Sequence, residues 1–83
     1  MAALVCDPQI GVTEYNIEVS GTVLHPFPSQ SNGSARYELD SSFIPGTYTF
    51  RLMAHGTGDW WSDWSLPFVA TKPNSPLGLR IIS

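Results

Sequence analysis

The chain has few of the sequence features that form disulfide bonds in small domains or anchor them in a membrane. It has one cysteine, Cys6, so a disulfide within the chain is excluded. Secreted domains of this size often carry several disulfides. The single cysteine therefore favours a reducing compartment, although some extracellular sandwiches have no disulfide. No stretch reaches transmembrane length, and the apolar start MAALVC is too short for a signal peptide and has no basic residue. We therefore expect no membrane segment, and localisation stays open, an extracellular or virion assembly included.

Charged residues are also scarce, at 13% of the chain, about half their usual share. Four basic side chains against seven acidic ones give a net charge of -3. Binding to nucleic acid generally requires a basic surface, so this class of partner is not expected.

Reactive side chains are few and do not occur at the spacings that chemistry requires. His25 and His55 have no Cys, His or Asp partner at metal-ligand spacing, so both are expected to be solvated. Cys6 lies in a predicted strand, where an inert core thiol is expected. The aspartates that could suggest a calcium site fall in separate turns, where turn and capping roles are expected: Asp7, Asp40, Asp59 and Asp63. We expect no cofactor, no metal and no enzymatic activity.

Strands, and not helices, are indicated throughout the chain. Seven prolines and seven glycines recur so often that no window of 11 residues keeps a helical period. Apolar residues alternate with polar ones over residues 13–19, 35–39 and 48–54, which is typical of half-buried strands. Residues 2–6 and 65–71 are weaker candidates, and Pro67 restricts the second to an edge strand or a bulge.

Short strands at roughly ten-residue spacing predict an all-β fold, an antiparallel β-sandwich. Residues 22–27 could add one more short strand, limited in length by two prolines. The inner face of the strands should supply the core, whose main members we expect to be Leu4, Tyr15, Ile17, Val19, Tyr37, Tyr48, Phe50 and Leu52.

Several segments together resemble a fibronectin type III domain over roughly residues 3–72. FIPGTYTFRLMA, residues 43–54, is similar to the passage between the fifth and sixth strands of that family, strands E and F. The resemblance implies that Tyr48 is the tyrosine-corner residue, with its ring in the core and its hydroxyl bonded to a backbone group upstream. GVTEYNIEVSG resembles strand C, and LVCDP resembles the end of strand B, with Cys6 in the place of the usual tryptophan.

WSDWS, residues 61–65, resembles the WSxWS motif of cytokine-receptor-like fibronectin domains and lies just before the expected last strand, strand G. In that family the tryptophans stack between arginines of strand F through cation–π contacts. On the outward face of this strand F, Arg51 is the arginine, and Met53 and His55 occupy the other positions. The resemblance therefore implies a short stack, with Arg51 against Trp61 or Trp64 and Met53 filling in.

The resemblance also implies that the first strand of the family, strand A, is missing at the N-terminus. Residues 1–72 are then the sandwich, strands B to G, and residues 73–83 are a linker followed by a segment that resembles a strand A. We expect a β-strand from Leu77 to Ile82 that pairs with a sheet edge. It could fold back beside its own sheet or reach a neighbouring chain, which would make a homo-oligomer.

Trp60, Trp61 and Trp64 have two interpretations. They could form an aromatic platform for a polysaccharide or a peptide, or two of them could be structural and stacked on strand F, with Trp60 the exposed one. We therefore expect a non-catalytic fibronectin type III-like module that acts as a structural spacer or a protein-interaction domain and contacts a protein partner or a neighbouring domain. The alternative is a carbohydrate- or ligand-binding accessory domain that uses its exposed tryptophans.

Overall fold

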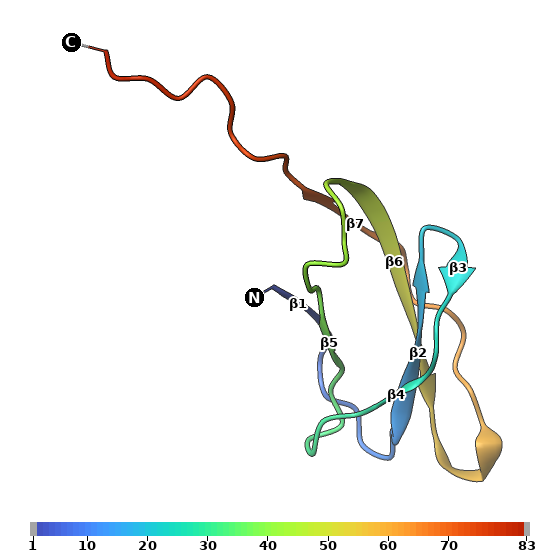
Figure 1. The fold of residues 1–83 in the computed structure, drawn as a ribbon. Helices are drawn as coiled ribbons and strands as arrows, with labels where there is room; N and C mark the ends of the chain where they lie inside the picture. Colours follow the sequence, from blue (N-terminus) through green and yellow to red (C-terminus); the bar gives the residue numbers. More distant parts are fainter. Residues whose placement is uncertain (1, 83) are drawn as a thin grey trace.

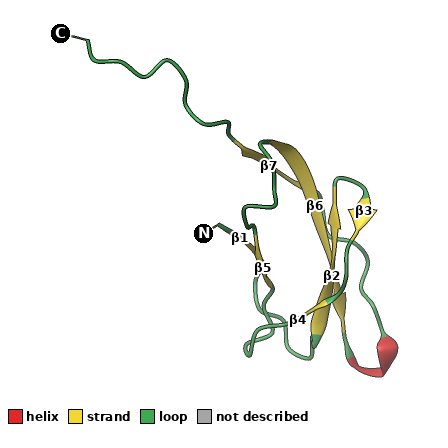
Figure 2. Ribbon diagram, viewed as in Figure 1, coloured by secondary structure: helices red, strands yellow, loops and turns green. Residues whose placement is uncertain are grey.

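Two antiparallel sheets form a sandwich-like arrangement in the computed structural model, which describes residues 2–82 (Figures 1 and 2). The smaller sheet pairs β1 (Ala3–Val5) with β5 (Arg36–Glu38). The larger sheet has the order β3-β2-β6-β7, and β4 pairs with β2 on the same side as β3. The strands of this sheet are β2 (Glu14–Val19), β3 (Thr22–Val23), β4 (Phe27–Pro28), β6 (Gly46–His55) and β7 (Phe68–Lys72). The predicted all-β class is confirmed.

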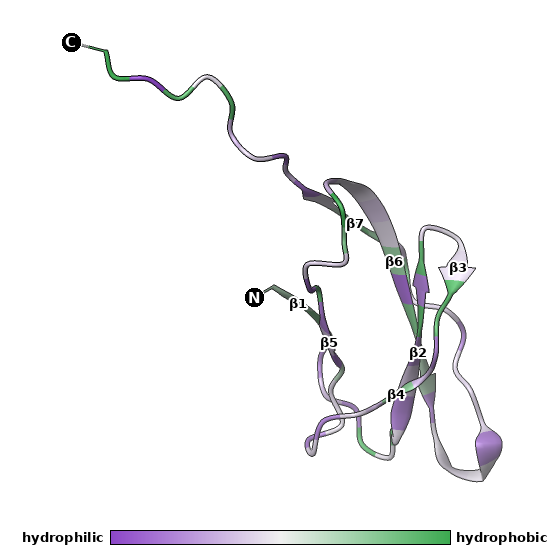
Figure 3. Ribbon diagram, viewed as in Figure 1, coloured by the Kyte–Doolittle hydropathy of each residue, from purple (hydrophilic) through white to green (hydrophobic). Residues whose placement is uncertain are grey.

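β2 and β6 pair in a register that brings their apolar residues together. Tyr15 lies opposite Ala54, and Ile17 lies opposite Leu52, so their side chains meet on the inner face. Bands of opposite hydropathy follow one another along both strands (Figure 3). Pro67 directly precedes β7, which lies at the end of the sheet order, as a proline at a sheet edge predicts.

The core is smaller than the predicted set. Tyr15, Ile17 and Phe50 are buried, and Ala35, directly before β5, joins them. The other predicted members are half-buried: Leu4, Val19, Tyr37, Tyr48 and Leu52. A two-stranded sheet cannot cover the whole inner face of a longer one, which explains why these side chains keep part of their exposure.

Aromatic rings extend the core toward both ends of the sandwich. Phe27 lies between Tyr15 and Tyr37, at centroid distances of 6.0 and 5.2 Å. The buried hydroxyl of Tyr15 donates a hydrogen bond of 2.6 Å to the carbonyl of Gly33. Burial raises the pKa of Tyr15 to about 12, and a contact with Cys6 adds to this effect. This tyrosine therefore remains a neutral donor that holds the 30–34 turn against β2.

The C-terminal segment does not form the strand within its own chain that the sequence predicts. Residues 73–82 carry no strand and extend away from the sandwich (Figure 1). With this segment the molecule measures 64 × 26 × 20 Å. The alternative in which the segment folds back onto its own sheet is therefore wrong for this structure. The physical reason is the position of β7: it ends at the pole where β1 begins, so residues 73–82 leave the sandwich beyond the edge with which they would have to pair (Figure 1). Pairing with a second chain stays a prediction.

Candidate functional site

The Trp61–Ser65 segment, called the WSDWS flank below, is attached to the edge of β6 by its two serines. The backbone N–H of Ser62 donates to the carbonyl of Ala54 at 2.8 Å, and the N–H of Ala54 donates to the Ser62 hydroxyl at 2.9 Å. Ser65 makes the same pair of bonds with Leu52, at 2.8 and 3.0 Å. Each serine thus supplies both an acceptor and a donor, as a paired strand would.

Replacing either serine should therefore weaken the attachment of the flank. Ser62→Ala and Ser65→Ala each leave one N–H of β6 without its acceptor, which we expect to cost about 1 kcal/mol of unfolding free energy. Chemical denaturation measures this loss. Ser41→Ala is the matched control, because Ser41 is exposed and lies outside the flank. Unfolding midpoints equal to that of the parent for both flank variants would mean that water replaces the hydroxyls.

Trp64 stacks on Arg51, one of the two contacts expected for that arginine. The guanidinium carbon lies 5.3 Å from the centre of the indole ring, within the range of a cation–π contact. The guanidinium also donates two hydrogen bonds to the carboxylate of Glu18, at 2.8 and 2.6 Å. The register of β2 and β6 places Glu18 directly opposite Arg51. A carboxylate, a cation and an indole thus follow one another across the outer face of the sheet.

The Glu18–Arg51 pair predicts a dependence of stability on acid. The hydrogen bonds from Arg51 lower the pKa of Glu18 below its ordinary value of 4.5. A lowered folded-state pKa means that the pair stabilises the fold above pH 4.5, and that this contribution is lost as the pH falls through the folded value. Glu18→Gln should lower the melting temperature at pH 7 and flatten its decline below pH 4.5. Glu38→Gln, in the exposed pair with Arg36, is the control and should change both less. Identical acid profiles for the two variants would contradict the prediction.

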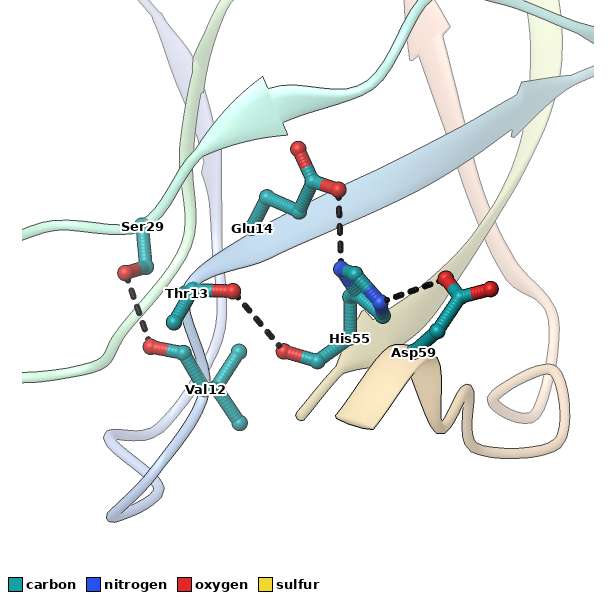
Figure 4. Close-up of polar contacts among 6 residues, drawn as sticks. All are labelled: Val12, Thr13, Glu14, Ser29, His55 and Asp59. Carbon is teal, nitrogen blue, oxygen red and sulfur yellow. Dashed lines mark hydrogen bonds and ion pairs between the residues drawn. The ribbon is translucent and has the colours of Figure 1, made fainter. Parts of the chain in front are cut away.

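Trp61 covers His55, which corrects the expectation of a solvated histidine. The two rings are nearly parallel, at a centroid distance of 4.2 Å and an angle of 15°. The His55 side chain is 18% exposed because this indole shields it. Its Nδ1 lies 2.8 Å from the carboxylate of Glu14, and its Nε2 lies 3.0 Å from that of Asp59 (Figure 4). His55 therefore stacks on Trp61 as Arg51 stacks on Trp64.

Two further hydrogen bonds hold Val12 and Thr13, the residues directly before β2, beside this histidine. The Ser29 hydroxyl donates to the carbonyl of Val12 at 2.9 Å, and the Thr13 hydroxyl donates to the carbonyl of His55 at 3.4 Å (Figure 4). Together with the pair of Glu14 and His55, they connect three segments that are distant in the sequence. The surroundings of His55 are therefore built from structural contacts.

Trp60 differs from the other two tryptophans because its side chain is 80% exposed. It lies beside the short 3-10 turn η1 (Thr57–Asp59) and borders a shallow hollow of about 300 Å³. Ile10, which is fully exposed, and Trp61 also border this hollow. An exposed indole next to an apolar neighbour is a surface on which a planar ligand can stack.

A larger groove of about 520 Å³ opens between β1 and the segment from the WSDWS flank to β7. Its apolar lining includes Leu4, Tyr15, Phe50, Leu52 and Phe68. Asp7 and Asp63 line it as well, together with Cys6, which is half-buried and not in the closed core that the sequence predicts. The groove joins the interior of the sandwich to solvent, which is why Phe68 remains 58% exposed.

Other predicted positions have local structural contacts. The Tyr48 hydroxyl donates to the carbonyl of Ile44 at 2.6 Å, and the Tyr48 ring meets Phe43 edge to face. Asp40 accepts hydrogen bonds from the backbone and the hydroxyl of Ser42, which lower its pKa. His25 is exposed, as expected.

Between residues 2 and 82 there is no group of three or more His, Cys, Asp or Glu side chains placed to hold a metal ion. Within the same residues no helix is long and apolar enough to cross a membrane. Comparisons of the chain with models of known protein families, with curated proteins and with solved structures give no match.

Proposed function

We propose that this chain is a non-catalytic module of the fibronectin type III kind, which serves as a structural spacer or a protein-interaction domain. The strand order β3-β2-β6-β7 facing β1-β5 supports this proposal, as does the bond from Tyr48 to the backbone of Ile44. The stack of Trp64 on Arg51 and the two serine attachments support the WSxWS likeness. His55 is the side chain best suited to acid–base chemistry. Its contacts with Glu14, Asp59 and Trp61 are structural, which supports a non-catalytic role.

The open groove is the observation that carries an interaction function. It is apolar, and β1 forms one of its borders while pairing with β5 on its other side. A sheet edge beside an apolar groove can accept an extended peptide, with main-chain hydrogen bonds for affinity and pockets for alternate side chains. The occupant is therefore a protein segment in extended conformation.

A peptide-display experiment tests this function. A library of extended peptides with alternating apolar residues is selected on the folded chain, and hydrogen exchange of the chain is measured with and without each selected peptide. We expect peptides that slow exchange of the β1 amides. A library without any peptide that protects β1 would overturn the proposed groove function.

A carbohydrate- or ligand-binding function through exposed tryptophans is the second candidate, because Trp60 is exposed and borders the 300 Å³ hollow. Titration of the parent and of Trp60→Ala with soluble polysaccharides, followed by tryptophan fluorescence, separates the two functions. A saturable change in the parent that is lost in Trp60→Ala would support this candidate. An unchanged spectrum in the parent would remove it.

A further inference from the structure

We infer that residues 77–82 of one copy add as a β-strand to the free edge of β1 in a second copy and fill the groove beside it. This inference rests on the proposed interaction function and names the occupant of its site. The chain therefore carries both halves of one contact: an open edge with an apolar groove, and an exposed apolar segment.

The receptor half is defined by the hydrogen bonds of β1. Leu39 donates to the carbonyl of Ala2 at 2.9 Å, and Cys6 donates to the carbonyl of Ala35 at 3.4 Å. Bonded pairs alternate along an antiparallel ladder, so the N–H and C=O groups of Ala3 and Val5 face away from β5. Within the described part of the chain β1 pairs with β5 alone. These groups of Ala3 and Val5 are therefore available to an incoming strand.

The donor half is an apolar segment that makes no strand in its own chain. Leu77, Leu79 and Ile81 are 92%, 88% and 97% exposed. In an extended strand these three side chains lie on one face, and Gly78, Arg80 and Ile82 lie on the other. The first face is wholly apolar and matches the lining of Leu4, Phe50, Leu52 and Phe68.

The direction of the chain prevents the segment from pairing in this way within its own molecule. The Lys72 ammonium donates to the carbonyl of Phe43, in the loop that follows β5. Ala2 is bonded to Leu39 at the start of the same loop, so β7 ends at the pole where β1 begins. An antiparallel partner of β1 must run toward this pole and must therefore enter the groove from the far end.

The linker is too short for that path. A strand of six residues is about 20 Å long, whereas the five Cα–Cα steps from Lys72 to Leu77 span at most about 18 Å. A segment from a second copy approaches from outside and is free of this limit. If two copies exchange segments, a closed dimer results, and one-way addition produces open rows.

Sedimentation equilibrium tests the inference by comparing the parent chain with variants of two neighbouring isoleucines. The parent should show a mass that rises above the monomer mass of 9.1 kDa with concentration. Ile81→Asp places a charge on the face that enters the groove and should weaken association at least about tenfold. Ile82→Asp is the matched control, since the same change lies on the opposite face and should alter association less than about threefold. Both residues are exposed, so neither variant should affect folding.

Hydrogen exchange at high and low protein concentration identifies the receptor edge. We expect the amides of Ala3 and Val5 to exchange more slowly at high concentration in the parent but not in Ile81→Asp. A mass of 9.1 kDa up to millimolar concentration would overturn the inference, and so would equal effects of the two aspartates. Association that leaves Ala3 and Val5 unprotected would also overturn it. The peptide-display experiment tests the proposed function separately. If the chain is monomeric but selected peptides protect β1, the proposed function stands, and only the second copy is excluded as the partner.

Discussion

Phe50→Ala is expected to lower the free energy of unfolding by about 3–5 kcal/mol. Phe50 is 3% exposed and lies near the rings of Tyr48 and Phe43, at centroid distances of 6.1 and 6.3 Å. Truncation removes apolar contacts and leaves a cavity that a β-sheet backbone cannot readily close. A domain of this size is stable by only about 5–15 kcal/mol, so the variant should melt far below the parent. Denaturant titration followed by circular dichroism measures the loss.

Phe68→Ala is the matched control for this experiment. Phe68 lies directly opposite Phe50 in the β6–β7 ladder but is 58% exposed. Since more than half of this ring already contacts water, its removal should cost less than about 1.5 kcal/mol. Equal losses from the two truncations would contradict the observed burial and would mean that β7 covers the core more fully.

Gly33→Ala is expected to destabilise the chain by about 2–5 kcal/mol, because two costs add at this position. The φ angle of Gly33 is +85°, where a residue with a Cβ is strained by about 1–2 kcal/mol. A Cβ there would also lie 2.3 Å from the carbonyl oxygen of Gln9, so the backbone must shift. That shift would disturb the carbonyl of Gly33, which accepts hydrogen bonds from the Tyr15 hydroxyl and the Gln9 amide.

Gly21→Ala separates the two costs. Gly21 has a similar φ of +89°, but an added Cβ would meet nothing within 4 Å. We expect this variant to lose only the strain, about 1–2 kcal/mol. Thermal unfolding of both variants beside the parent gives the difference that the Gln9 contact causes. Equal losses would show that the 9–11 loop moves away from residue 33 without cost.

The strands of the larger sheet could be predicted because their sequence reflects their surroundings. A half-buried antiparallel strand has one face in the core and one in water, so apolar and polar residues alternate along β2 and β6. The same alternation correctly placed Tyr15, Ile17 and Phe50 inside. Pro67 likewise predicted an edge strand or a bulge, because proline has no N–H to donate to a neighbouring strand, and β7 is an edge strand.

Contacts between distant segments carry a weaker signal in the sequence. The partners of Ser62 and Ser65 are backbone groups of Leu52 and Ala54, and backbone groups are the same in every residue. The sequence does repeat Trp-Ser after three positions, but this repeat suggested a role for the tryptophans and not for the serines. His55 was expected to be solvated for a similar reason, because its environment comes from Glu14 on another strand and from the indole of Trp61.

The sequence by itself determined the fold class, the facing of the long strands and the places where they stop, since these depend on local periodicity, proline and glycine. Only the tertiary structure decided which charged group stacks on which indole, how the serines attach their segment, and that the space beside β1 is an open groove. It also decided that residues 73–82 leave the sandwich without pairing. The physical reason is that these outcomes depend on the register between strands and on where each strand ends in space, and the alternation within a single strand contains neither.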